Sequence, residues 1–241
     1  ANPKFVFLRS PLRHDEFSNA LDAVVVDDWS RAIALQPDLA VIATPSSMHL
    51  EALAVLLPAG VPCYIEKPVV ATDEQYDALC KLLARESVLP PTVVGCNLRF
   101  LPSLVALRTL LAEGTIGRPV RASLQVGQWL PDWRPTQDYR ASYSADRERG
   151  GGVVLDLIHE LDAARWLFGD FERVHAVGGR HSRLEIGTED AAAIILGRAA
   201  GPAVSIGLDY VARRYVRRYE VFGDEGSLVW DLPAKRLERM D

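Results

Sequence analysis

Two side chains in the sequence have the chemistry to act on a hydroxyl group, and each is placed by a patterned segment. Lys67 follows the apolar run Pro62–Glu66, and His159 lies inside the helical pattern Val153–Leu167. An imidazole titrates near working pH and can take the proton of a hydroxyl group as a carbonyl forms. A lysine ammonium beside that oxygen lowers the energy of the developing alkoxide. The two residue types therefore indicate acid–base chemistry on an alcohol or a ketone.

A third candidate, Asp156, precedes His159 by three residues, a spacing that puts both side chains on one face of a helix. Gly150–Gly152 mark the expected start of this helix, and Gly169 marks its expected end. Each candidate also has a simpler interpretation. Lys67 could be a solvated residue at a strand end, His159 a structural histidine, and Asp156 an acidic residue favoured by the dipole of the first helical turn.

The first half of the chain alternates β-branched segments with longer amphipathic ones, which is typical of a parallel sheet with crossover helices. This places Lys67 at the carboxyl end of a parallel strand, where open α/β sheets bind ligands. Asp38–Thr44 has continuous apolar residues and is expected to be fully buried, and the Thr72 hydroxyl is expected to cap the amide of Gln75. The expected strands are residues 4–8, 24–26, 38–44, 62–66 and 92–95, and the expected helices are 49–57, one beginning at 72, and 102–112.

The second half has longer, partly alternating segments separated by turn residues, which predict a mostly antiparallel sheet. One helix, 153–167, interrupts it. We therefore expect a Rossmann-like α/β domain with a doubly wound parallel sheet over residues 1–97, and an α+β domain with a large open sheet over residues 98–241. The expected strands of the second domain are residues 120–129, 173–177, 191–197, 204–211 and 219–230.

Composition excludes several classes of protein. The 241 residues are 49% hydrophobic and carry a net charge of −5, with 27 Lys and Arg spread along the chain, so nothing indicates nucleic-acid binding. Pro58 and Gly60 interrupt the longest apolar stretch, so no membrane span is expected. Cys63, Cys80 and Cys96 lie singly and predict buried thiols, without a disulfide framework or a metal site. We expect a cytoplasmic protein.

Four motifs in register resemble the Gfo/Idh/MocA family of oxidoreductases, and together they cover nearly the whole chain. They are Ala43-Thr44-Pro45 with His49, Glu66-Lys67-Pro68, Asn97 with Arg99-Phe100, and Gly150–Asp156 with His159 and Arg165–Gly169.

The resemblance implies an NAD(P)-dependent dehydrogenase or reductase that acts on CH–OH groups of sugars, with Lys67, Asp156 and His159 meeting beside the nicotinamide. His49 is expected to contact the cofactor, although a histidine at a helix start can also cap the turn. Arg99 is expected at the substrate. The expected cofactor contacts are Arg9, Ser10, Ala43, Thr44, Pro45, His49, Glu66, Lys67, Pro68 and Asn97.

The sequence departs from the family pattern in two ways. It contains no GxGxxG turn and opens at what resembles the second strand, so pyrophosphate binding cannot be assigned. Because the first strand of a doubly wound sheet lies centrally, its absence should split the sheet, and we expect an N-terminal segment and a C-terminal helix outside the 241 residues. The commonest family pattern also separates the acid and the histidine by four residues, whereas Asp156 and His159 are three apart.

The end of the first expected strand bears on the choice between NADP and NAD. A carboxylate after the second family strand bonds the ribose 2′-hydroxyl of NAD, and a basic residue there accepts the 2′-phosphate of NADP. Arg9 and Ser10 occupy this place, with Arg13 close by. This favours NADP, although arginines are also ordinary loop residues.

Residues 128–149 form a long segment rich in Trp, Tyr and Arg, which is typical of a functional loop. Aromatic faces pack on sugar rings, and arginines bind carboxylates or phosphates, so Trp129, Tyr139 and Arg140 are expected to bind the substrate, with anionic or nucleotide-linked sugars among the candidates. The same composition suits an oligomer contact, and a homodimer or homotetramer through the C-terminal sheet is expected. Two other functions stay open: redox-neutral elimination or glycosidic cleavage with a tightly bound cofactor, and a non-catalytic sensor or scaffold.

Overall fold

The computed structural model describes residues 6–8 and 24–241. The chain divides into two compact units, residues 1–95 and 96–241. The division falls two residues before the boundary expected from the sequence.

Unit 1 is a small parallel α/β structure. Its main sheet has the order β3 (Ala40–Ile42), β4 (Cys63–Ile65), β5 (Thr92–Val94), with all neighbours parallel. β1 (Val6–Leu8) and β2 (Val24–Val26) form a separate parallel pair, so the expected split into two sheets is present. A short helix, α2 (Trp29–Ala34), follows β2.

Two helices build the core of unit 1 against the main sheet. α3 (His49–Leu56) contributes Leu53 and Leu56, and α4 (Asp73–Arg85) adds partly buried leucines. The predicted cap is confirmed, since Thr72 Oγ1 accepts a hydrogen bond from Gln75 N at 3.2 Å. The expectation that residues 38–44 are fully buried is wrong: Val41 is 64% exposed, because Ile42 alone of this strand is buried in the core against α3. Cys80 is exposed, contrary to expectation.

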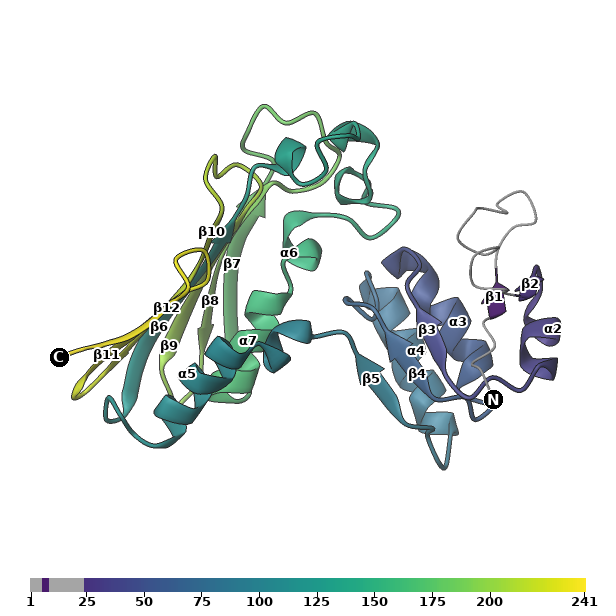
Figure 1. Cartoon of the computed structure of the whole chain (residues 1–241), viewed down its shortest axis with the longest axis horizontal. Coiled ribbons are helices and arrows are strands. Elements are labelled where there is room, and N and C mark those ends of the chain that lie inside the picture. The colour runs from purple at the N-terminus through teal and green to yellow at the C-terminus, as the bar shows by residue number, and fades with distance from the viewer. Residues whose placement is uncertain (1–5, 9–23) are drawn as a thin grey trace. The chain divides into compact units, whose positions relative to one another are not determined.

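Unit 2 is built on the predicted open, mostly antiparallel sheet (Figure 1). Within this sheet only β6 (Pro119–Gly127) and β9 (Ala203–Asp209) pair in parallel. Along the central strands, every second residue enters one core that contains Leu124, Ile206 and Trp230. The order is β12 (Arg236–Met240), β11 (Gly226–Asp231), β10 (Val216–Gly223), β6 (Pro119–Gly127), β9 (Ala203–Asp209), β8 (Ala191–Gly197) and β7 (Arg173–Gly179).

Two predictions for unit 2 are wrong. Residues 219–230 are not one strand but the hairpin of β10 and β11, closed where Gly223 pairs with Gly226, and Gly226 has the positive φ of +147° that such a turn requires. The single helix 153–167 is two helices, α6 (Val153–Asp156) and α7 (His159–Phe168), separated by Leu157 and Ile158.

The helices of unit 2 lie on one face of the sheet (Figure 1). α5 (Pro102–Ala112) begins and ends at the predicted residues, with proline at its first position, where no amide donor is needed. Within the described ranges, no helix is long and apolar enough to cross a membrane.

Candidate functional site

The Glu66-Lys67-Pro68 segment follows the central strand of the unit 1 sheet. Glu66 N donates to Ile42 O at 2.9 Å, so the strand ladder continues one residue beyond β4. Tyr64 hydroxyl donates to Glu66 Oε1 at 3.2 Å, as expected for side chains two residues apart on one face of a strand. Lys67 is half-buried, and the Lys67–Pro68 peptide is cis. The lysine therefore lies at the carboxyl end of a parallel strand.

The Ala43-Thr44-Pro45 segment follows the neighbouring strand β3, so it lies at the same edge of the sheet. Ala43 and Thr44 are exposed, whereas His49 is fully buried. The His49 Nδ1 atom is 2.9 Å from Pro68 O, and Nε2 is 2.9 Å from Thr44 O. Both ring nitrogens therefore face backbone carbonyls, and no side chain caps the start of α3.

Asn97 and Arg99 lie in η2 (Asn97–Phe100), at the start of unit 2. Asn97 is exposed. Arg99 forms a bidentate pair with Asp162 of α7, through Nε to Oδ2 at 2.9 Å and Nη2 to Oδ1 at 2.6 Å. The hydrogen bonds that Arg99 donates to Asp162 raise the pKa of Arg99. The guanidinium predicted to bind substrate therefore anchors η2 to α7.

Two of the three glycines before α6 are required by close packing. A Cβ on Gly151 would overlap Tyr143 O, and a side chain on Gly152, whose φ is +126°, would meet the Glu189 carboxylate. That carboxylate accepts from Val154 N at 3.3 Å, so it caps the short helix from a distant segment. The glycines thus set the start of the helical segment that carries Asp156 and His159.

Asp156 is buried and is held by a residue that the sequence did not single out. Tyr210, just after β9, donates its hydroxyl to Asp156 Oδ2 at 2.6 Å, and it is fully buried itself. Burial and the Asp156 charge raise the pKa of Tyr210, so the hydroxyl stays a donor. The helix breaks directly after Asp156, with Leu157 at φ −101° and ψ 28°. His159, half-buried, is the first residue of α7.

The residue after His159 belongs to a buried ionic cluster that sequence analysis also missed. Glu160 is fully buried, and its Oε1 is 2.8 Å from Arg217 Nε and 3.1 Å from the Tyr219 hydroxyl that donates to it. Burial raises the pKa of Glu160, and Arg217 opposes the shift without cancelling it. Both partners come from β10, 57 and 59 residues along the chain, and no local pattern around Glu160 indicates them.

The aromatic and basic loop 128–149 packs on other segments of unit 2. The Arg213 guanidinium lies 3.5 Å from the centre of the Trp129 ring. Arg140 pairs with Asp138 at 2.9 Å and with Glu185 at 2.8 Å, and its pKa is raised by these carboxylates. Tyr139 hydroxyl accepts from the Glu185 amide at 3.3 Å. The structure brings Tyr139 and Arg140 together at Glu185, and Trp129 lies against Arg213. The loop contains η3 (Leu130–Asp132), η4 (Tyr139–Ala141) and η5 (Tyr143–Ala145).

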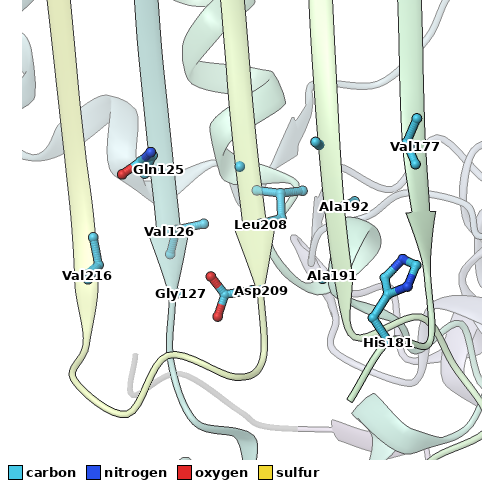
Figure 2. Close-up of a pocket in the computed structure, with 12 residues that line it drawn as sticks. Gln125, Val126, Gly127, Val177, His181, Ala191, Ala192, Leu208, Asp209 and Val216 are labelled. Carbon is cyan, nitrogen blue, oxygen red and sulfur yellow. The ribbon is translucent and has the colours of Figure 1, made fainter.

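A hollow lies on the sheet of unit 2 (Figure 2). It has a volume of about 460 Å³, and small residues such as Gly127 and Gly207 leave the space open. Asp209 and His181 lie at its rim. None of the residues predicted for catalysis, cofactor or substrate lines it. Among residues 6–8 and 24–241, no cluster of three or more His, Cys, Asp or Glu could hold a metal ion.

Arg9 and Ser10, predicted to contact the cofactor, lie outside the described residues.

Comparison with known proteins gives two family matches that together cover most of the chain. Residues 4–93 match the oxidoreductase family, NAD-binding Rossmann fold, and residues 104–229 match the GFO/IDH/MocA C-terminal domain.

Curated relatives and solved structures agree with these matches. Levoglucosan dehydrogenase of Pseudarthrobacter phenanthrenivorans is 27% identical over 85% of this chain and 58% of its own length. D-apiose dehydrogenase of Paraburkholderia graminis is 32% identical over 81% of this chain and 51% of its own length. The chain thus spans little more than half of these relatives. The crystal structure of the WlbA dehydrogenase from Bordetella pertussis, in complex with NADH and UDP-GlcNAcA, superposes with a TM-score of 0.83 at 22% identity, over 98% of this chain and 68% of that one. It shows a common fold.

Proposed function

Because the chain belongs to the Gfo/Idh/MocA oxidoreductase family, we propose that it serves hydride transfer between a nicotinamide cofactor and a ring hydroxyl or keto group of a sugar. The observation that carries the proposal is the position of Lys67, at the carboxyl end of β4 in the unit that matches the NAD-binding model. Open α/β sheets bind their ligands at that edge. The proposed catalytic residues are Lys67, Asp156 and His159.

Each catalytic residue has a role that its chemistry suits. The His159 imidazole takes the proton of the reacting hydroxyl, and in the reverse direction returns it. The Lys67 ammonium stabilises the negative charge on the same oxygen. Asp156, held by Tyr210 at 2.6 Å, fixes the point where α6 ends and α7 begins, and so positions the first residue of α7.

The edge of the unit 1 sheet suits the nicotinamide half of the cofactor. Small, exposed Ala43 and Thr44 follow β3, and Gly95, whose Cβ would come within 2.6 Å of the Tyr64 hydroxyl, follows β5. Bound NAD or NADP would supply the carbon that accepts or donates hydride. We propose that residues 43–45, 66–68 and Asn97 hold it, and that Arg9 and Ser10 favour NADP. Tighter binding of NADH than of NADPH in a fluorescence titration would contradict the proposed preference for NADP.

The substrate is proposed to be bound from unit 2. Arg99 and Arg140 already pair with carboxylates, so an anionic sugar would have to compete with Asp162 or Glu185. The half-buried Tyr139 and Trp129 are the proposed contacts for a neutral ring. Replacing Tyr139 and Arg140 with Ala is expected to raise the KM of the true substrate. An unchanged KM with a changed oligomeric state would assign the loop to an interface instead.

The homo-oligomer is proposed to form through the open face of the unit 2 sheet, where Val177 and Ile195 are 74% and 56% exposed. Exposed apolar side chains on adjacent strands suit a subunit contact. Light scattering of a Val177→Lys, Ile195→Lys variant should report smaller particles than the wild-type protein, and an unchanged mass would remove this assignment.

The function is tested by following nicotinamide absorbance with a panel of sugars and their keto forms. Lys67→Ala and His159→Ala should each lower turnover by about 10²-fold or more, whereas Lys81→Ala, which changes an exposed lysine of unit 1, should not. Wild-type protein that turns over no sugar with either cofactor would overturn the proposal. Product formation without net change in the cofactor would replace it with a redox-neutral reaction.

A further inference from the structure

One buried histidine connects the two loops at the ligand-binding edge of unit 1. His49 is fully buried, and its two ring nitrogens each lie 2.9 Å from a backbone carbonyl, Nδ1 from Pro68 O and Nε2 from Thr44 O. Thr44 follows β3, and Pro68 follows β4, the neighbouring parallel strand. A single ring therefore spans the gap between two segments that are 24 residues apart in the sequence.

We propose that His49 is a positioning residue that clamps the two loops together and thereby fixes Lys67, and that it does not bind the cofactor itself. The consequence for Lys67 rests on the function proposed above, whereas the clamp itself does not.

The chemistry of the contacts supports a clamp. Carbonyl oxygens only accept hydrogen bonds, so each contact requires an N–H on the ring. A ring protonated at both nitrogens donates to both carbonyls, and a neutral ring donates to one. Because water does not reach the fully buried ring, a carbonyl that loses its donor there pays the full cost of desolvation. A loop carbonyl that accepts a hydrogen bond from the ring is therefore held at the ring.

Lys67 is held between two backbone anchors. On one side, Glu66 N donates to Ile42 O at 2.9 Å, the last bond of the strand ladder. On the other side, Pro68 O meets His49. Only one residue lies between these anchors, so the backbone of Lys67 has little freedom while both hold. Releasing Pro68 would let the ammonium move by the distances that cost a catalyst much of its rate.

A second side chain makes the same connection farther from Lys67. Gln75 Nε2 donates to Ser47 O at 2.9 Å, and Gln75 Oε1 accepts from Ala71 N at 2.9 Å. Ser47 lies in η1 (Ser46–Met48), in the loop after β3, and Ala71 lies in the loop after β4. Two independent braces therefore join the same pair of loops, which indicates that their relative position is specified.

The two carbonyls can be tested separately. The amide nitrogen of Asn lies close to the place of Nδ1, and that of Gln close to the place of Nε2, so His49→Asn keeps a donor for Pro68 O and His49→Gln keeps one for Thr44 O. Leu53→Ala is the matched control, because Leu53 is 1% exposed on the same helix and belongs to the core, not to the clamp. Hydrogen exchange is measured by mass spectrometry on peptides covering residues 43–48 and 66–71, together with kcat and the dissociation constant of NADPH.

In His49→Gln, exchange should rise at residues 66–71 alone, and kcat should fall by about 10-fold with little change in NADPH affinity. In His49→Asn, exchange should rise at residues 43–48, and kcat should stay close to that of the wild type. Leu53→Ala should lower stability without either local change.

Equal exchange at residues 66–71 in His49→Gln and wild-type protein would overturn the clamp. Loss of NADPH binding in both His49 variants with unchanged exchange would make His49 a cofactor ligand instead. If the wild-type protein shows no turnover, the proposed function fails, and the exchange data still decide on the clamp.

Discussion

The two units hold their candidate catalytic residues by different means. In unit 1, Lys67 is fixed by backbone groups: a strand ladder on one side and the carbonyl clamped by His49 on the other. In unit 2, the segment carrying Asp156 and His159 is fixed by side chains of β10 and of the residue after β9, which lie 54 to 59 residues along the chain. The motif in unit 1 is held by backbone groups and by a histidine of the same unit, whereas the motif in unit 2 is held by side chains of distant strands.

The largest effect should come from breaking the buried ionic cluster of unit 2. Arg217→Met leaves the Glu160 carboxylate, which is 0% exposed, without its cation, and is expected to lower the free energy of unfolding by about 3–5 kcal/mol. Arg218→Met is the matched control on the same strand, because Arg218 is 37% exposed, and it should cost less than about 1 kcal/mol. Urea denaturation measures both, and equal losses would show that the cluster does not support α7.

The next effect concerns the anchor of Asp156. Tyr210→Phe removes only the hydroxyl that donates to the carboxylate, and should lower the free energy of unfolding by about 1.5–3 kcal/mol and reduce kcat. Tyr76→Phe, at a tyrosine that is 59% exposed in unit 1, should do neither. A Tyr210 variant with wild-type stability and turnover would show that this motif does not depend on its contact with the sheet.

A smaller, local effect is expected in unit 1. Thr72→Ala deletes the hydroxyl that caps α4 and should lower the free energy of unfolding by about 1 kcal/mol. Thr72→Ser keeps an oxygen in the same place and should restore most of the loss. If both variants lose the same stability, the cap does not account for the start of α4.

The smallest effect is a pH dependence in unit 2. Burial acts to raise the pKa of Asp190, but hydrogen bonds from the amides of His181 and Ser182 and from the Ser182 hydroxyl outweigh it and lower the pKa below 3.8. A carboxyl group with a lowered pKa in the folded state stabilises the protein above its unfolded pKa, and this contribution is lost as pH falls through the folded value. The free energy of unfolding should therefore fall more steeply below about pH 4 in wild-type protein than in Asp190→Asn. Parallel curves would contradict this.

The sequence predicted the elements whose signals are local. The bounds of α5 and the cap of α4 follow from proline at a helix start and from threonine three residues before a glutamine. The failures have different causes. Tyr210, which binds Asp156 at the end of α6, lies 54 residues along the chain, so no local pattern indicates this contact. The β10–β11 turn does have a local signal, Gly223-Asp224-Glu225-Gly226, which the sequence analysis did not use.

The candidate site shows the same limit. Motif spacing drew attention to His49, but its contacts could not be predicted because both partners are backbone carbonyls, which have no sequence signature. Arg140 was predicted to bind substrate from its residue type, and Arg99 from the resemblance carried by its motif. The carboxylates that pair with them, Asp162 and Glu185, lie 63 and 45 residues away.

The claim on which the proposed function depends most is that Lys67 and His159 serve the same step of one reaction. A cycle of Lys67→Met, His159→Asn and the double variant, with kcat/KM measured for one sugar and one cofactor, tests it directly. Groups that act as a unit lose little more together than singly, so the double variant should be about as slow as the slower single variant. Losses that multiply would show that the two residues contribute independently, and would contradict the account.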